Sequence, residues 1–276
     1  MSGLAVFSTL TTEQALAIDS IDRSEAAYLL RAVTGKKLAQ LIAHSDERLT
    51  AKQSRRFLAL VKRRRKGEPV AYLIGRREFY GMDFEISPAS MIPRPETELL
   101  VELALDRIAE DAPARILDLG AGSGAIGVSI AALRPMVEVL AVDRSSECLA
   151  LAQRNAQRLL ENEKRVSFRR SDWFKALDGE RYELIVSNPP YIAEQDPYLE
   201  QGDLRFEPRA ALAAGGDGLD AIRHIVAQAP HHLEKGGWLL FEHGYDQADA
   251  ARSLLQGAGF SDLVTGKDLA GIVRVA

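Results

Sequence analysis

The order of apolar and polar residues changes character about a third of the way along the chain. Residues 11–66 carry apolar side chains at helical spacing, in short stretches separated by capping residues and glycines. From residue 114 onward the pattern becomes an apolar strand, a turn and an amphipathic helix, repeated several times. The first region therefore predicts a small helical bundle. The second predicts an α/β fold with a parallel sheet and right-handed helical crossovers.

The first region is expected to contain four or five short helices. Thr11, Ser24 and Thr50 each precede an apolar series, at the position where a helix usually begins. Gly35 and Gly67 follow two of these series, where helices usually end. The region contains no nucleophile and no cluster of metal ligands, so substrate recognition is its predicted role.

A connecting segment precedes the sheet. Residues 78–86 have the pattern of a β-hairpin with Gly81 near its turn. Two prolines then straddle Arg94 just before a helix, which makes this segment rigid enough to form the wall of a site. A proline-rich linker leading into a helix is the alternative interpretation. We therefore expect three parts: a helical substrate-recognition domain at residues 1–75, a hairpin and linker at 76–95, and the sheet domain at 96–276.

Five strands and at least four helices are expected in the sheet domain. The expected strands are residues 114–119, 137–142, 165–170, 182–187 and 237–241. The expected helices begin at about residue 125 and cover 146–162, 219–234 and 246–258. A long loop rich in glycine and proline covers residues 192–217, and residues 260–276 are expected to form a terminal strand pair.

Composition excludes several classes of protein. The chain has no run of about 18 apolar residues, so no membrane span is expected. Residues 1–5 lack the basic start and apolar core of a signal peptide. Cys148 is the single cysteine, which excludes an internal disulfide and a multi-cysteine metal site. A cytoplasmic protein is the resulting expectation.

Charge is distributed unevenly within a net charge of −4. Residues 1–84 carry 15 Lys and Arg against 9 Asp and Glu, which is +6, and the remainder carries 20 against 30, which is −10. The densest basic run is residues 62–66, which is either the solvated end of a helix or a contact for an acidic or RNA-associated partner.

Residues suited to binding an adenosine group follow the first three strands. A glycine loop after the first strand lets a ligand approach the backbone and the next helix N-terminus. Asp143 ends the second strand, where a carboxylate can accept both ribose hydroxyl protons or simply cap a helix. Asp172 and Trp173 end the third, where they can contact an adenine amine and ring, although Trp173 is alternatively a core residue. The glycine loop consists of Gly120, Ala121, Gly122, Ser123 and Gly124.

The fourth strand ends in a loop with an unusual composition. It consists of Asn188, Pro189, Pro190 and Tyr191. The prolines fix their own backbone and restrict the residues before them, so the loop is stiff. The Asn188 oxygen and a backbone carbonyl can accept both N–H bonds of an amino group, and Tyr191 can stack on a planar substrate. A proline-terminated strand with a capping Asn is the alternative. With the three preceding strand ends, this loop predicts a cleft for an adenosine cofactor beside a bound amine.

These motifs resemble the class I S-adenosylmethionine-dependent methyltransferases, whose Rossmann-like sheet is the expected fold. Further segments make the chain similar to the HemK/PrmC family; they are residues 68–75, 78–81, 92–98 and 207–212. The resemblance implies transfer of a methyl group from S-adenosylmethionine to the side-chain nitrogen (N5) of a glutamine. The implied substrates are class 1 peptide chain release factors, at their GGQ motif.

The resemblance also implies roles for individual residues. The glycine loop, Asp143, Asp172, Trp173 and Asn188 are expected to bind the cofactor in the domain 96–276. The Asn188–Tyr191 loop is expected to bind the substrate and to act as the catalytic element. The amide proton can leave after methylation, so no general base is expected. No metal is expected, and the enzyme is expected to be a monomer.

Three other functions fit parts of the pattern. An adenine-N6 nucleic-acid methyltransferase uses a similar loop, but the acidic sheet domain makes duplex DNA an unexpected partner. A ribosomal-protein glutamine methyltransferase is a closer alternative. A cofactor-binding regulator without catalysis is a third, and the intact Asn188–Tyr191 loop argues against it.

Overall fold

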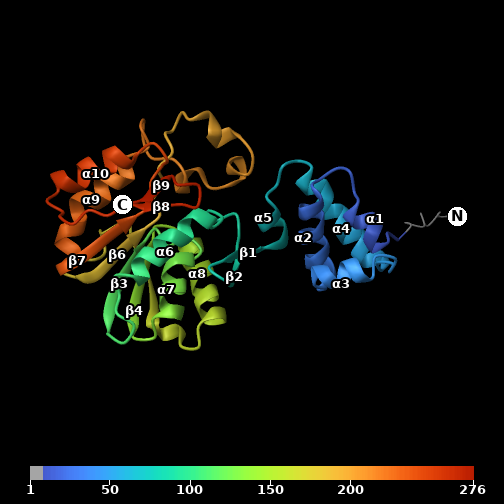
Figure 1. Cartoon of the computed structure of the whole chain (residues 1–276), viewed down its shortest axis with the longest axis horizontal. Coiled ribbons are helices and arrows are strands. Elements are labelled where there is room, and N and C mark those ends of the chain that lie inside the picture. Colours follow the sequence, from blue (N-terminus) through green and yellow to red (C-terminus); the bar gives the residue numbers. More distant parts are fainter. Residues whose placement is uncertain (1–8) are drawn as a thin grey trace. The chain divides into compact units, whose positions relative to one another are not determined.

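The computed structural model describes residues 9–276 of the chain drawn in Figure 1. Residues 1–8, which include the segment considered above for a signal peptide, lie outside the described residues. The chain divides between Gly75 and Arg76 into two compact units. None of the helices in residues 9–276 is long and apolar enough to cross a membrane.

The described residues of the first unit, 9–75, form five helices, and four of them lie within residues 11–66, where four or five were predicted. Thr11 caps α1 through a capping box, in which its hydroxyl accepts the Gln14 N–H and the Gln14 side chain accepts the Thr11 N–H. Thr50 and Gln53 form the same arrangement at α4. The helices are α1 (Thr12–Leu16), α2 (Arg23–Thr34), α3 (Leu38–Ala43), α4 (Ala51–Arg64) and α5 (Val70–Ile74).

The second helix begins earlier than the apolar pattern indicated. Asp22, in an extended conformation, is the N-cap of α2, so Ser24 lies inside the first turn. Gly35 ends this helix in the left-handed region with φ 72°, as predicted. Both Asp and Ser suit an N-cap, and the local sequence does not distinguish between them.

Part of the basic run at residues 62–66 is used within the first unit. The Arg63 guanidinium donates to Glu68, with its Nε 2.7 Å from Oε2. Arg64 pairs with Glu25 of α2 at 2.8 Å. These two cations therefore form ion pairs within the unit at the end of α4, which neither interpretation of the basic run included.

The second unit opens with the predicted β-hairpin. Strand β1 (Arg76–Phe79) pairs antiparallel with β2 (Met82–Glu85). Tyr80 and Gly81 connect them with φ of 50° and 72°. Positive φ at both central residues is the geometry of a tight hairpin turn that matches the twist of its strands.

A five-stranded parallel sheet forms the centre of the second unit. Its strands lie in the order β5-β4-β3-β6-β7. The chain moves from β3 outward through β4 to β5, and then returns to the other side of β3 to form β6 and β7. The order therefore reverses between β3 and β6, and open α/β sheets bind ligands at such a point. The strands are β3 (Ala114–Leu119), β4 (Val137–Asp143), β5 (Val166–Arg170), β6 (Tyr182–Ser187) and β7 (Leu233–Phe241).

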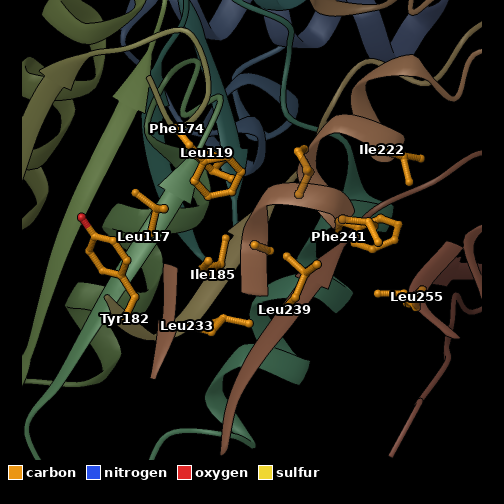
Figure 2. Packing of buried hydrophobic residues seen from close by; sticks show 14 of the residues in the cluster. Leu117, Leu119, Phe174, Tyr182, Ile185, Ile222, Leu233, Leu239, Phe241 and Leu255 are labelled. Carbon is orange, nitrogen blue, oxygen red and sulfur yellow. The ribbon is translucent and has the colours of Figure 1, made fainter. Parts of the chain in front are cut away.

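Helices cover both faces of this sheet, as right-handed crossovers require on the two sides of β3. α6, α7 and α8 pack beside one another, and α9 and α10 pack together against the opposite face (Figure 1). Figure 2 shows the core beneath α9 and α10, where Leu117, Ile185 and Phe241 are 0% exposed. The helices are α6 (Glu98–Leu105), α7 (Ala125–Leu133), α8 (Ser146–Leu159), α9 (Asp220–His232) and α10 (Ala248–Gly257).

The predicted terminal strand pair is present as two short strands. β8 (Gly266–Lys267) pairs antiparallel with β9 (Val273–Val275). The backbone of Ala276 then exchanges two hydrogen bonds with Phe241 of β7, at 2.9 and 3.1 Å. The predicted loop at 192–217 contains three short 3₁₀ turns and one bridge between Ile192 and Ala213.

Candidate active site

A cleft of about 730 Å³ lies within the second unit, at the carboxyl ends of β3, β4, β5 and β6. This volume is in the range of small-molecule sites. Its walls bring together most of the predicted residues: Gly120, Ala121, Gly122, Ser123, Asp143, Asp172, Trp173, Asn188 and Pro190. Gly124, Pro189 and Tyr191 are outside its lining.

The glycine loop is shaped by three left-handed residues. Gly120, Gly122 and Gly124 have φ of 75°, 55° and 81°, which L-residues rarely adopt. A Cβ on Gly124 would lie 2.9 Å from the Ala152 Cβ, so only glycine lets α7 begin this close to α8. Gly124 therefore acts by packing and not by contact with the cleft.

Asp143 is held by the backbone on both of its oxygens. Oδ2 accepts the Gly122 N–H at 3.0 Å, and Oδ1 accepts the Ser145 N–H at 2.8 Å. The carboxylate therefore ties the glycine loop to the start of α8 while it lines the cleft. A carboxylate has about four acceptor positions, so lone pairs remain for ligand hydroxyls.

Asp118 lies directly beneath this loop without reaching the cleft. It is fully buried, and its Oδ2 accepts the Gly127 N–H at 3.0 Å. Burial raises the pKa of Asp118 to about 7, and the nearby Asp143 adds to that effect. Its position makes it an anchor for the first turn of α7.

Asp172 and Trp173 occupy the end of β5. The Asp172 side chain is 46% exposed and binds Lys175, whose hydrogen bond lowers the pKa of this carboxyl. Trp173 has φ 54°, an unusual conformation for a bulky residue. Its ring lies next to Gly120, with Cζ3 3.7 Å from where a Cβ on that glycine would be. The ring is thus placed at the cleft beside the glycine loop and also packs on the core.

The Asn-Pro-Pro-Tyr loop presents only part of itself to the cleft. Asn188 and Pro190 line it, and the Asn188 Nδ2 donates to the Thr97 hydroxyl at 3.0 Å. The Tyr191 hydroxyl instead donates to Glu242 at 2.9 Å. Burial, followed by the charge of Glu242, raises the pKa of Tyr191. Tyr191 therefore remains a neutral hydrogen-bond donor at the back of the loop.

The sequence did not assign roles to two residues that hold this loop. Thr97 and Glu242 are 3% and 1% exposed, and the Thr97 hydroxyl lies 2.6 Å from the Glu242 Oε2. Glu242 follows directly on the apolar β7, and an acid at the end of a buried strand was the available signal. Thr97 lies inside the 92–98 segment, next to prolines and charged residues, and nothing in its own local sequence indicates a role.

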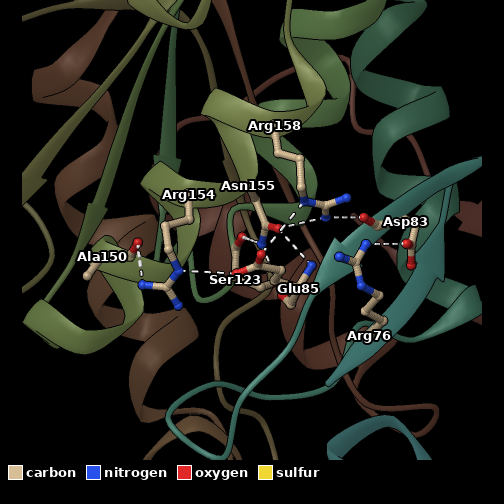
Figure 3. Close-up of polar contacts among 8 residues, drawn as sticks. All are labelled: Arg76, Asp83, Glu85, Ser123, Ala150, Arg154, Asn155 and Arg158. Atoms are coloured by element: carbon tan, nitrogen blue, oxygen red, sulfur yellow. Dashed lines mark hydrogen bonds and ion pairs between the residues drawn. The ribbon is translucent and has the colours of Figure 1, made fainter. Parts of the chain in front are cut away.

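Asn155 is a third residue that sequence reasoning missed. It is 0% exposed in α8, and its Nδ2 donates to the Ser123 and Glu85 carbonyls at 2.9 and 3.0 Å. Its Oδ1 accepts the Glu85 N–H at 2.7 Å. Figure 3 shows this amide between the glycine loop and the hairpin. A polar residue on the apolar face of an amphipathic helix was the signal for it.

A partly buried ion pair joins two segments that contribute residues to the cleft lining. Arg94 binds Glu207, whose side chain is 0% exposed. The other Glu207 oxygen accepts the Ile92 N–H at 3.0 Å. The prediction that the segment around Arg94 forms a wall thus has a physical basis, since Met91 and Pro93 of this segment line the cleft, as does Pro208 next to Glu207.

The donors and acceptors of the cleft suit an adenosine ligand. Backbone N–H groups, a ribose-type acid and an aromatic ring converge at the switch point of the sheet. Next to them Asn188 offers an amide oxygen that has no protein partner within residues 9–276. In the described part of the chain, no three His, Cys, Asp or Glu side chains gather as metal ligands would.

Two family models match the sequence. Residues 96–219 match the methyltransferase small domain, and residues 11–75 match the PrmC N-terminal domain. A methyltransferase structure from Pyrococcus furiosus has a TM-score of 0.52 at 16% identity, and covers 82% of this chain and 96% of that one. The predicted class I methyltransferase fold is confirmed.

Curated relatives match over nearly their whole length. A release factor glutamine methyltransferase from Burkholderia pseudomallei is 51% identical over 98% of this chain and 96% of its own. The Pseudomonas aeruginosa protein of the same name is 50% identical, covering 97% and 96%. The Escherichia coli K12 protein of that name is 48% identical, covering 92% and 90%.

Proposed function

Because the chain belongs to the release factor glutamine methyltransferases, we propose how the residues of its cleft carry out that reaction. The enzyme transfers a methyl group from S-adenosylmethionine to a glutamine of release factors. When bound, the cofactor supplies a methyl group on a positively charged sulfur. The work left to the chain is to bind that cofactor, align the amide nitrogen and exclude water.

We assign cofactor binding to the walls on the β3, β4 and β5 side. The ligand contacts the backbone of the glycine loop, and Asp143 accepts hydrogen bonds from the ribose hydroxyls. The Trp173 ring packs on the adenine, and Asp172 accepts its amine. This role for Asp172 uses its Oδ1, because Oδ2 is the oxygen that binds Lys175.

Asn188 is the residue that we propose to hold the substrate amide. Its oxygen accepts one N–H of the glutamine side chain, and a carbonyl of the proline-fixed loop accepts the other. The amide plane is then fixed, and its nitrogen faces the methyl group. Pro190 bounds the position at the cleft wall. Tyr191 supports this loop from behind through Glu242, because its ring is not part of the lining.

Catalysis on this arrangement requires alignment and no base. An amide nitrogen is a weak nucleophile, and orientation alone is worth effective molarities of ~10⁵ M or more. The nitrogen becomes acidic once it is methylated, so its proton leaves to water. The observation that carries the proposal is the Asn188 oxygen without a protein partner at the switch point of the sheet.

We further propose that the helical unit recognises the release factor at a surface away from the glutamine. Its net positive charge supports this, because residues 1–75 carry 13 Lys and Arg against 7 Asp and Glu, which is +6. The remaining parts of the proposal are class 1 release factors as substrates, the N5 atom of the GGQ glutamine as the target, and a cytoplasmic monomer that does not bind duplex DNA.

Single-turnover methylation with Asn188→Ala tests the central role. We expect a fall of at least ~10²-fold in rate, as when one preorganised contact is lost. Cofactor affinity should fall less, and Asn188→Asp, which keeps the acceptor, should retain more activity than Asn188→Ala. An adenine-containing DNA duplex serves as the rival substrate. Methylation of that duplex in place of release factor, or a wild-type rate for Asn188→Ala, would contradict the proposal.

A further inference from the structure

Four side chains form a hydrogen-bonded chain behind the Asn-Pro-Pro-Tyr loop. Asn188 Nδ2 donates to the Thr97 oxygen, the Thr97 hydroxyl donates to Glu242 Oε2, and the Tyr191 hydroxyl donates to Glu242 Oε1. The chain begins and ends in the same loop. Glu242 itself is fixed by its own backbone, since its N–H donates to the Ser187 carbonyl at 3.0 Å.

The number of available protons fixes the donor and the acceptor in each of these hydrogen bonds. Both oxygens of Glu242 accept in the structure, Oε2 from Thr97 and Oε1 from Tyr191, as in an ionised carboxylate, so Thr97 uses its single hydroxyl proton on Glu242. The Thr97 oxygen can then only accept from Asn188. The Asn188 amide must therefore turn its NH₂ toward Thr97, and its oxygen is left facing the cleft.

We propose that Glu242, acting through Thr97, is a positioning residue that sets which end of the Asn188 amide meets the substrate. The inference rests on the proposed role of Asn188 in holding the glutamine amide. Two NH₂ groups facing each other repel, so an Asn188 turned the other way would bind the substrate amide poorly. A carboxylate two side chains away prevents this reversal.

The surroundings of Glu242 bear on its charge. Burial raises the pKa of Glu242, whereas the hydrogen bonds from Thr97 and Tyr191 and the charge of Arg274 lower it, and Glu96 adds a like charge. A proton on Glu242 Oε2, with Oε1 still accepting from Tyr191, would make Glu242 a donor to Thr97. Thr97 could then donate to the Asn188 oxygen, which would reverse the amide. Glu242→Gln imitates this neutral state.

The test is a double-mutant cycle in single-turnover methylation of a release factor. Thr97→Val keeps the side-chain shape and removes the hydroxyl, and Thr97→Ser keeps the hydroxyl. In the wild-type background we expect Thr97→Val to lower the rate about tenfold, in proportion to one lost hydrogen bond, and Thr97→Ser to remain near wild type. In the Asn188→Ala background Thr97→Val should change the rate less than about twofold, because no amide is left to orient.

The two backgrounds separate positioning from mere support of the fold. An equal loss in both would show that Thr97 acts only on structure, and no loss in either would show that it does not act on Asn188; each result overturns the inference. Glu242→Gln should reproduce the Thr97→Val loss if it folds. If wild type fails to methylate release factor, or Asn188→Ala is as fast as wild type, the proposed function fails instead.

Discussion

Removal of the Arg94 guanidinium should destabilise the second unit by leaving a buried carboxylate with one hydrogen bond. Breaking a buried ion pair typically destabilises by about 3–5 kcal/mol. The Arg94 side chain is 27% exposed while that of Glu207 is 0% exposed, so water reaches one side of the pair. We therefore expect Arg94→Met to lower the free energy of unfolding by about 2–3 kcal/mol.

Glu207→Gln is the matched variant because it removes the charge and keeps an acceptor for the Ile92 N–H. Alone it should destabilise less than Arg94→Met. Arg94→Met combined with Glu207→Gln should be more stable than Arg94→Met alone, because no buried charge remains. The coupling in this cycle should be at least about 1 kcal/mol.

Urea unfolding followed by tryptophan fluorescence measures this directly. The chain has two tryptophans, and both Trp173 and Trp238 belong to the second unit, so the signal does not mix with unfolding of the helical bundle. Hydrogen exchange of the Ile92 amide is a second readout, since its bond to Glu207 should open in Arg94→Met without global unfolding.

The loss of stability in Arg94→Met should also depend on pH. Burial raises the pKa of Glu207, and Arg94 opposes that rise, so Arg94→Met should raise this pKa further. Protonated Glu207 needs no cation. The loss of unfolding free energy in Arg94→Met should therefore be small below the ordinary glutamate pKa of about 4.3. It should grow as the pH rises through the raised pKa of Glu207 in that variant. Two results together would refute the reasoning. The effects of Arg94→Met and Glu207→Gln on the free energy of unfolding would be additive, and the loss in Arg94→Met would be independent of pH and below about 0.5 kcal/mol, as for a surface substitution.

Two further predictions concern the cofactor and the partner. Asp143→Ala should weaken S-adenosylmethionine binding by ~1–3 kcal/mol in calorimetry, the usual effect of losing hydrogen bonds to a charged group. Unchanged affinity would show that Asp143 does not bind the ribose. Reversing Lys62 and Arg65 to Glu should raise KM for the release factor and leave cofactor binding alone. This variant spares the Arg63–Glu68 and Arg64–Glu25 pairs. Kinetics indifferent to the reversal and to salt would leave the basic run without a role in docking.

The parts of the fold that follow from local chemistry were predictable. The apolar periods located β3, β4 and β6 within one residue, because each strand is buried on both faces and bounded by turn residues. The glycine loop and the hairpin turn were predictable for a second local reason, because a left-handed backbone selects glycine. Strand β7 begins earlier than expected, at Leu233, because Glu234, Lys235 and Gly236 interrupt the apolar pattern between that residue and the expected start at residue 237.

The supporting contacts of the site were not predictable from neighbours in the sequence. Thr97 and Glu242 are 145 positions apart, and Thr97 and Asn188 are 91 apart. Their meeting depends on the order of strands in the sheet, which no local pattern specifies. The partner of the Tyr191 hydroxyl illustrates the same limit. An aromatic ring after two prolines indicates a ligand platform, whereas the buried acceptor that orients its hydroxyl comes from the end of β7.

The reversal of strand order at β3 leads us to expect a particular order of folding events. Strands β3, β4 and β5 pair with neighbours along the chain, so this half can form through short loop closures. β6 must find β3 across them, with Ser187 bonding to Leu119 from 68 positions away, which is the slower entropic step. On this expectation the glycine loop and Asp143 form before that step, and Asn188 reaches the cleft after it. A ligand that touches both halves therefore stabilises the last pairing to form and slows its release.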